Sequence, residues 1–361
     1  MKATQELHNL GQSLWLDNIT RELLDNGTLK RYIDDLSVTG LTSNPTIFEH
    51  AISKSNSYDG EISRLVANGL SAEDVFFELA LHDLTRAADL FASIHQRTAG
   101  NDGFVSLEVS PLLAYDVDGT SAAAASLHKK ANRPNLFIKI PGTKEGNLAI
   151  EKSTAAGIAI NVTLLFSREH YLESADAYMK GLERRIDAGL SPDVRSVASV
   201  FVSRWDGATI EKVPEPLRDK LGLSVGKQIY KAYRDTLDSA RWQRLANFGA
   251  RPQRLLFAST GTKDPKASDI LYVGGLAAPN TINTMPEKTL LAFGDHGRLS
   301  GALPRDGGDC ESVLEDFRKA GIDLGQLAAD LQSNGAKSFD ESWSNLLTAI
   351  ESKGKQLKLA S

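Results

Sequence analysis

The chain has 361 residues and a formal net charge of -5 at pH 7, with 41% hydrophobic and 24% charged residues. This balance argues against binding of nucleic acid or anionic lipid through a basic surface. No apolar run approaches the length of a membrane span, and the start of the sequence lacks the apolar core of a signal peptide. Since the only cysteine, Cys310, cannot form an internal disulfide, we expect a cytoplasmic protein with no nucleic-acid or membrane partner.

Eight strand-like apolar runs alternate with segments of helical pattern along most of the chain. Strands that alternate with helices favour parallel βαβ units. Eight such units predict an α/β fold of the (β/α)₈ or TIM-barrel type over about residues 13–285, and a doubly wound open sheet is the alternative. The expected strands cover residues 13–19, 37–48, 103–111, 135–143, 157–166, 194–203, 253–260 and 269–277.

Helix signals are clear in three of the intervening segments. In residues 71–96, Ser71 is placed to cap the N-terminus, Asp74 follows three residues later, and apolar residues recur at helical spacing. The pattern predicts two further helices, over residues 167–190 and 225–249.

The last part of the chain, about residues 286–361, has no strand pattern. It predicts helices over residues 311–321 and 339–354. Because these segments are amphipathic, we expect them to pack against the barrel. The prediction is therefore one domain over residues 1–361, a barrel with a helical C-terminal extension.

Polar residues stand near the C-terminal ends of seven of the expected strands. In a (β/α)₈ barrel these ends surround one pocket, where catalytic groups gather. One polar residue there would mean little, but acidic, amide, amine and hydroxyl groups from several strands predict a shared site. The candidates are Asp17, Asn44, Glu108, Lys139, Asn161, Thr163, Ser199, Arg204, Ser259 and Lys263.

Lys139 is the most unusual candidate, because it interrupts an apolar strand between Ile138 and Ile140. Burying an ammonium group is costly, so the side chain either reaches water along its aliphatic stem or serves chemistry as an amine. In an apolar pocket the pKa of a lysine falls, and the neutral amine attacks a ketone to form a Schiff base. Asp17 and Glu108 are then suited to general acid–base work on a sugar.

The remaining candidates suit the recognition of a phosphorylated polyol. Amide and hydroxyl groups hold sugar hydroxyls, and cations together with a hydroxyl hold a phosphate. The first group comprises Asn44, Asn161 and Thr163, and the second comprises Arg204, Ser259 and Lys263.

Purely structural interpretations stay open for several of these residues. Asp17 also suits a helix N-cap, Asn44 a turn residue, and Lys263 a solvated loop position. Thr163 and Ser199 also suit ordinary strand positions. The seven histidines show no metal-ligand spacing, so no metal site is expected.

Five stretches of the sequence form a set: GLTSNPTIF (40–48), LEVSP (107–111), NLFIKIPGTKEG (135–146), INVTLLFS (160–167) and SVFVSR (199–204). Together they resemble the transaldolases, over about residues 10–285 and in the same order. The stretches T-S-N-P and I-K-I-P-G-T are rather specific as a pair. The resemblance implies a (β/α)₈ barrel with its Schiff-base lysine on the fourth strand. It also implies transfer of a dihydroxyacetone unit from a ketose phosphate to an aldose phosphate, without a metal or organic cofactor.

The resemblance assigns a role to most of the candidate residues. Lys139 matches the Schiff-base lysine, Asp17 the aspartate that takes a sugar hydroxyl proton, and Glu108 the glutamate that works through a water beside the lysine. Thr163 matches the threonine that helps to place that water. The asparagines that contact the donor sugar and the serine and phosphate-binding arginine of S-x-F-V-x-R correspond to Asn44, Asn161, Ser199 and Arg204.

The sequence departs from the family pattern after the seventh expected strand. Many transaldolases carry a second phosphate-binding arginine in an A-S-F-R stretch, whereas residues 258–263 read A-S-T-G-T-K. Lys263 is the candidate replacement, a point charge without the bidentate fork of arginine. The helical tail and the segment 284–297 are typical of a longer-chain, bacterial-type subgroup.

Two other functions stay open beside a transaldolase. A lyase similar to fructose 6-phosphate aldolase would release dihydroxyacetone, and a non-catalytic phosphosugar-binding barrel would leave Lys139 unreactive. We favour the transaldolase of the non-oxidative pentose phosphate pathway. Its donor would be sedoheptulose 7-phosphate or fructose 6-phosphate, and its acceptor glyceraldehyde 3-phosphate or erythrose 4-phosphate. Both a homodimer and a monomer are compatible with the sequence.

Overall fold

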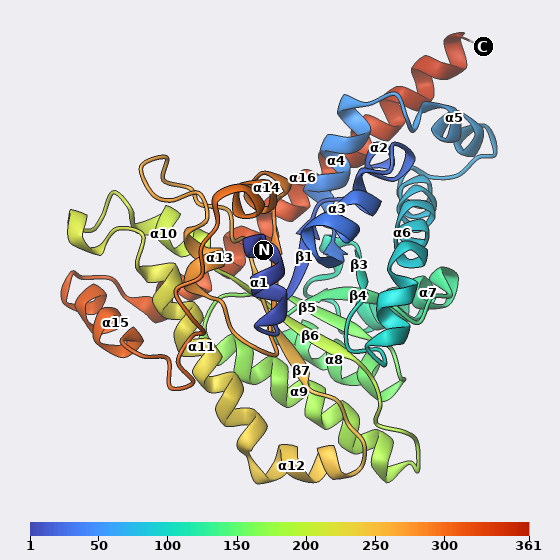
Figure 1. The fold of residues 1–361 in the computed structure, drawn as a ribbon. Coiled ribbons are helices and arrows are strands. Elements are labelled where there is room, and N and C mark those ends of the chain that lie inside the picture. Colours follow the sequence, from blue (N-terminus) through green and yellow to red (C-terminus); the bar gives the residue numbers. More distant parts are fainter. Residues whose placement is uncertain (361) are drawn as a thin grey trace.

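A closed barrel of eight parallel strands forms the centre of the molecule (Figure 1). The computed structural model describes residues 1–360, with side chains up to residue 358. The strands are β1 (Ser13–Asp17), β2 (Val38–Thr42), β3 (Val105–Glu108), β4 (Leu136–Pro141), β5 (Ile160–Leu165), β6 (Ser196–Phe201), β7 (Gln253–Ala258) and β8 (Ile282–Met285). Each strand pairs with the next in chain order, and β1 also pairs with β8. This closure confirms the (β/α)₈ barrel and excludes the open sheet.

Helices surround the barrel, and two 3₁₀ turns, η1 (Pro111–Leu113) and η2 (Glu215–Leu217), interrupt the loops. Because helices cover the outer face of the strands and side chains fill the interior, almost every strand residue is buried. The helices that precede β6 are α1 (Ala3–Asn9), α2 (Arg21–Asp25), α3 (Thr28–Leu36), α4 (Pro45–Lys54), α5 (Asp59–Ala67), α6 (Ala72–Arg97), α7 (Val117–Ala131), α8 (Lys144–Ala155) and α9 (Arg168–Asp187). Those that follow are α10 (Ser203–Thr209), α11 (Leu221–Asp238), α12 (Ala240–Asn247), α13 (Leu271–Gly275), α14 (Glu287–His296), α15 (Cys310–Lys319) and α16 (Leu324–Ala360).

Three of the five predicted helices agree with the structure, those over residues 71–96, 167–190 and 311–321, and a fourth divides into two. Ser71 caps α6 by accepting a hydrogen bond from the Asp74 amide, and Ser167 caps α9 in the same way. The segment 225–249 is not one helix, because the chain breaks at Ser239 between α11 and α12. The hydroxyl of Ser239 accepts a hydrogen bond from the Trp242 amide, so Ser239 is the N-cap of α12.

The eighth strand lies elsewhere than the sequence predicted. Residues 269–277 contain the short helix α13, and β8 follows at Ile282–Met285. Gly275 in that segment packs closely on Leu223 of α11, where an added Cβ would lie 2.7 Å from a methyl group. Asn283 and Thr284 make half of β8 polar although both are buried. This strand therefore lacks the apolar run that revealed the other seven.

The C-terminal helix α16 is much longer than the predicted segment 339–354, and it packs on α4, α5 and α6. Figure 1 shows it passing from the barrel along α4 toward the C-terminus. Its apolar residues, among them Phe339, Trp343 and Leu346, are buried in the same cluster as the barrel. Among the described residues, no helix is long and apolar enough to cross a membrane.

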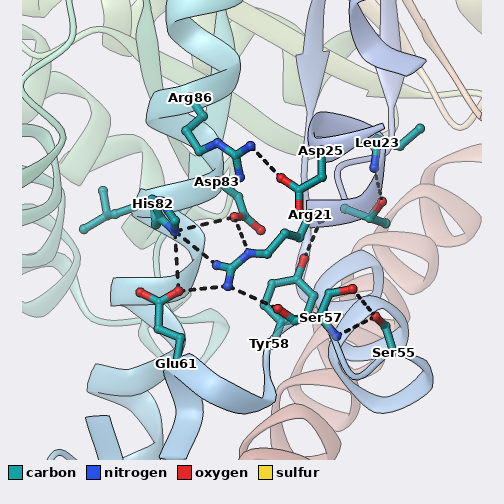
Figure 2. Close-up of polar contacts among 12 residues, drawn as sticks. Arg21, Leu23, Asp25, Ser55, Ser57, Tyr58, Glu61, His82, Asp83 and Arg86 are labelled. Carbon is teal, nitrogen blue, oxygen red and sulfur yellow. Dashed lines mark hydrogen bonds and ion pairs between the residues drawn. The ribbon is translucent and has the colours of Figure 1, made fainter. Parts of the chain in front are cut away.

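A cluster of charged side chains joins three helices on the outside of the barrel (Figure 2). Arg21 of α2 forms salt bridges with Asp83 of α6, at 3.0 Å, and with Glu61 of α5, at 2.8 Å. Its guanidinium lies over the Tyr58 ring, 4.5 Å from the centroid. Asp83 is fully buried, so Arg21 supplies the charge that makes this burial tolerable.

Candidate active site

A cavity of about 240 Å³ opens at the C-terminal ends of the strands. A larger groove of about 800 Å³, beside α9 and α15, contains none of the predicted site residues. The smaller cavity is therefore the candidate active site. The predicted residues that line it are Asp17, Asn44, Lys139, Thr163, Ser199, Arg204, Ser259 and Lys263.

Lys139 and Glu108 form a buried ion pair at the base of this cavity. The register of β3 and β4 places the two residues opposite each other. The Lys139 Nζ donates to Glu108 Oε2 at 3.2 Å and to the Ser43 carbonyl oxygen at 3.0 Å. Only 5% of the Lys139 side chain is exposed, so the amine does not reach bulk water and the snorkelling interpretation is wrong.

Glu108 keeps one carboxylate oxygen free for a further proton-transfer partner. Burial raises the pKa of Glu108, and the nearby Lys139 charge opposes that rise. Within the described residues, its Oε1 atom is buried without a hydrogen-bond partner. The free oxygen and the raised pKa together suit Glu108 to general acid–base chemistry.

Asp17 ends β1 and turns its carboxylate to the cavity. Thr42 of β2 donates a hydrogen bond to Asp17 Oδ1 at 2.7 Å. Burial raises the pKa of Asp17, while the Lys139 charge, the Thr42 hydrogen bond and the Lys263 charge lower it. The alternative role as a helix cap is wrong, because Thr20 caps α2.

Neighbouring strands β5 and β6 present a chain of polar groups beside Lys139. Ser199 donates to Asn161 Oδ1 at 2.7 Å, and the Asn161 amide donates to the Ser106 hydroxyl at 3.0 Å. Asn161 thus lies behind Ser199 and is held in one orientation. The Thr163 hydroxyl is buried without a hydrogen-bond partner in the described part of the chain, and it is therefore available to a water or a substrate in the cavity.

Asn44 caps a helix, where the structural interpretation of the sequence had a turn, and it also faces the cavity. Its Oδ1 accepts a hydrogen bond from the Ile47 amide at 3.0 Å and so caps α4, with Pro45 at the first helical position. The same residue lines the cavity. Capping leaves the amide hydrogens of Asn44 as the donors for a sugar hydroxyl.

Arg204 supplies an uncompensated positive charge at one side of the cavity. It forms no hydrogen bond or salt bridge with any residue that the structure describes. Its guanidinium lies over two aromatic rings, 5.1 Å from the centroid of Phe201 and 5.9 Å from that of Phe339. Burial without an anionic partner lowers the pKa of Arg204. Such a group is suited to a phosphate.

Two residues of the loop after β7 lie near Arg204 at the cavity. The backbone of Ser259 has a φ of 54°, in the left-handed region, and its hydroxyl lies 2.9 Å from that of Ser203. Lys263 lines the cavity as an exposed side chain without a salt bridge or hydrogen bond to the described residues. Its charge nevertheless contributes to the field at Asp17.

Comparison with known proteins extends over nearly the whole chain. The pattern of the Transaldolase/Fructose-6-phosphate aldolase family matches residues 14–350. The chain belongs to this family. A transaldolase of Saccharopolyspora erythraea is 42% identical over 98% of both chains. Transaldolases of Thiobacillus denitrificans, covering 97% of this chain and all of the relative, and of Mycolicibacterium smegmatis, covering 94% of each, are also 42% identical.

The family match includes most of the C-terminal helix α16. This helix supplies one residue of the site that the sequence did not suggest. Phe339 of α16 lines the cavity although it lies far along the chain from the last strand. No local feature distinguishes it, because Phe339 and Trp343 are spaced like any apolar pair on a helix face. The prediction also missed Thr42 and Phe201, each two residues from a predicted residue, and Thr284 of β8, the strand that the sequence did not locate.

Proposed function

We propose that the protein is a transaldolase that moves a dihydroxyacetone unit from a ketose phosphate to an aldose phosphate. The observation that carries this proposal is the Lys139 amine, buried beside Glu108 at a cavity that also holds Asp17 and Arg204. The transaldolase names of relatives that share the full length of the chain support it. The donors are sedoheptulose 7-phosphate or fructose 6-phosphate, and the acceptors are glyceraldehyde 3-phosphate or erythrose 4-phosphate, in the non-oxidative pentose phosphate pathway.

In the first half of the reaction, the Lys139 amine becomes a nucleophile by giving a proton to Glu108. The amine attacks the ketone carbon of the donor and forms a carbinolamine. Glu108, through a water near the Thr163 hydroxyl, then protonates the carbinolamine hydroxyl, which leaves as water. The product is a protonated Schiff base, an iminium whose positive charge withdraws electrons from the neighbouring carbon–carbon bond.

In the second half, Asp17 accepts the proton of the hydroxyl on the far side of that bond. The bond breaks, its electron pair moves into the iminium to give an enamine, and the shortened aldose phosphate leaves. The enamine carbon then attacks the aldehyde of the acceptor, and Asp17 returns its proton to the new hydroxyl. Water hydrolyses the iminium and frees Lys139. Asn44 and Ser199 hold sugar hydroxyls, and Asn161 orients Ser199 from behind. Arg204, Ser259 and Lys263 bind the phosphate.

Trapping with borohydride tests this proposal directly. The protein is incubated with fructose 6-phosphate, reduced with borohydride and digested, and the masses of the peptides are measured. We expect a reduced dihydroxyacetone adduct on the peptide that contains Lys139, and we expect prior addition of erythrose 4-phosphate to deplete it. An adduct that erythrose 4-phosphate leaves unchanged would identify a lyase similar to fructose 6-phosphate aldolase. The absence of any adduct from a folded protein that still binds phosphate would indicate a non-catalytic barrel.

The same proposal places the protein in the cytoplasm. The sequence contains one cysteine, Cys310, so the fold does not depend on disulfides. A chain of this kind is suited to a reducing compartment. Localisation of a tagged protein, followed by cell fractionation, tests this part of the proposal.

A further inference from the structure

The C-terminal helix α16 is fastened to the two strands that carry Lys139 and Thr163. The side-chain amide of Gln332 donates to the Gly142 carbonyl, just after β4, and to the Leu164 carbonyl in β5, both at 3.0 Å. Leu164 has a φ of 59°, an unfavourable conformation for leucine, which turns this part of β5 away from regular pairing with β6. Gln332 of the helix thus donates a hydrogen bond to the Leu164 carbonyl, which the irregular strand leaves without a regular strand partner.

One turn further along α16, the helix backbone approaches Arg204 closely. A Cβ atom added to Gly335 would lie 3.1 Å from Arg204 Nη1 and 3.0 Å from a Leu164 methyl group. Phe339 follows four residues later on the same face of the helix. Its ring lies under the Arg204 guanidinium and 4% of the residue is exposed, so it is held between the cation and the core.

The helix is also tied to the opposite side of the cavity. The Ser342 hydroxyl lies 2.7 Å from that of Thr46, a cavity-lining residue in the first turn of α4. Phe339 therefore sits between two anchored points, Gln332 before it and Ser342 after it. The helix backbone that carries Phe339 is thus anchored by contacts that do not involve Arg204.

Aromatic rings hold a cation differently from carboxylates. A ring face attracts the guanidinium and restricts its orientation, but it does not neutralise the charge. A carboxylate in the same place would compete with a phosphate for the donors of Arg204. The absence of an acidic partner among the described residues and the presence of two rings thus leave the whole charge of Arg204 for a ligand.

We infer that Phe339 is a positioning residue that orients Arg204 for the phosphate of the substrate, so that the C-terminal helix sets the preference for phosphorylated sugars. This inference rests on the proposed function, because it takes a phosphate as the ligand of Arg204. Phe339 does not act on the reacting carbon atoms. Its effect is expected in substrate affinity and not in the bond-making steps.

The test compares two donors that form the same Schiff base on Lys139, one with a phosphate and one without. Fructose 6-phosphate and free dihydroxyacetone are each titrated against the full-length protein, and the amount of borohydride-trapped adduct gives the half-saturating concentration. In the Phe339→Leu variant we expect this concentration to rise roughly tenfold for fructose 6-phosphate, in keeping with the strength of a partly desolvated cation–π contact. For dihydroxyacetone it should stay unchanged. Phe339→Tyr keeps the ring face and should restore most of the affinity.

Matched variants separate positioning from general damage. Phe317→Leu removes an equally buried ring from α15, outside the cavity, and should change neither titration. In an Arg204→Ala background, Phe339→Leu should add little further loss for fructose 6-phosphate, because the two residues act as one unit. Losses that add in full would show that Phe339 acts independently of Arg204 and would overturn the inference.

The remaining outcomes also decide the question. An unchanged titration with fructose 6-phosphate, or an equal loss for both donors, would overturn the positioning role of Phe339. If the unmodified protein traps neither donor on Lys139, the proposed function fails and the inference fails with it. That result is distinct, because it appears before any residue of α16 is changed.

Discussion

Lys139 keeps its amine inside the barrel because the Glu108 carboxylate and the Ser43 carbonyl both accept hydrogen bonds from it. The sequence could predict this residue, since a lysine inside an apolar strand is conspicuous. It could also predict Asp17, because parallel strands bring their C-terminal ends together. It could not predict Phe339, whose place at the cavity depends on the direction of a helix in three dimensions and leaves no trace in local spacing.

The Thr42 hydroxyl influences the pH dependence of catalysis through its hydrogen bond to Asp17. Burial raises the pKa of Asp17, and the hydrogen bond from Thr42 partly offsets that rise. Asp17 must be ionised to accept a proton, so activity is lost as the pH falls through its pKa. Thr42→Val removes the donor and raises the pKa further, and the acid limb of kcat/KM should therefore move to higher pH. Rate measurements over a pH series check this shift.

Thr39→Val is the matched control for that experiment. Thr39 lies on the same strand, but its hydroxyl bonds to the Leu14 carbonyl and lies outside the cavity. Its replacement should leave the acid limb in place. A limb that moves to lower pH in Thr42→Val, or that moves equally in both variants, would contradict the assignment of Asp17 as the proton acceptor.

At the scale of elements, hydrophobic runs predicted seven strands because those strands are buried on both faces. The eighth could not be found in this way, since Asn283 and Thr284 fill polar positions in the barrel interior. The division of α11 from α12 was missed for another reason. Both segments have helical spacing, and they are separated at Ser239 by its extended backbone and its hydrogen bonds to Thr236 and Trp242. Individual hydrogen bonds of this kind are decided by tertiary geometry.

The cluster that joins α2, α5 and α6 gives a prediction about stability. Arg21→Leu would leave the fully buried Asp83 without its ionic partner, and we expect a loss of about 3–5 kcal/mol in the free energy of unfolding. Arg21→Leu combined with Asp83→Leu removes both charges and should recover much of that loss. Urea unfolding followed by circular dichroism measures both. A double variant no more stable than the single one would show that the other contacts of Arg21, with Glu61 and the Tyr58 ring, cause the loss and not the unpaired charge of Asp83.

At the scale of the whole molecule, the barrel and the C-terminal helix share one continuous apolar cluster. Trp343 of α16 is 1% exposed, and its ring packs edge-on against Phe76 of α6 at 4.9 Å. Helix and barrel therefore stabilise each other through direct contact. On this ground we propose that the chain behaves as a single domain.

Trp343→Ala tests that proposal. We expect a loss of about 3–5 kcal/mol in the free energy of unfolding, the usual range for removing a buried tryptophan. The fraction of the variant that stays folded should also bind fructose 6-phosphate more weakly. Loss of Trp343 loosens α16, and α16 positions Phe339. Trp242 lies in a separate apolar cluster. Trp242→Ala should therefore destabilise the protein without lowering its affinity for fructose 6-phosphate. Two separate unfolding transitions in Trp343→Ala would mean that α16 and the barrel are independent units.

The place of Phe339 in the chain also affects the order in which the protein becomes competent during synthesis. A ribosome has completed all eight strands when it reaches Met285, but it must continue to Phe339 before the last wall of the cavity exists. At about 5–20 residues per second this takes roughly 3–10 seconds. During that interval the chain carries Lys139, Glu108 and Asp17 but lacks Phe339, one of the two rings that contact Arg204. On the inference drawn for Phe339, selectivity for phosphorylated sugars is therefore completed only after the catalytic residues have been made.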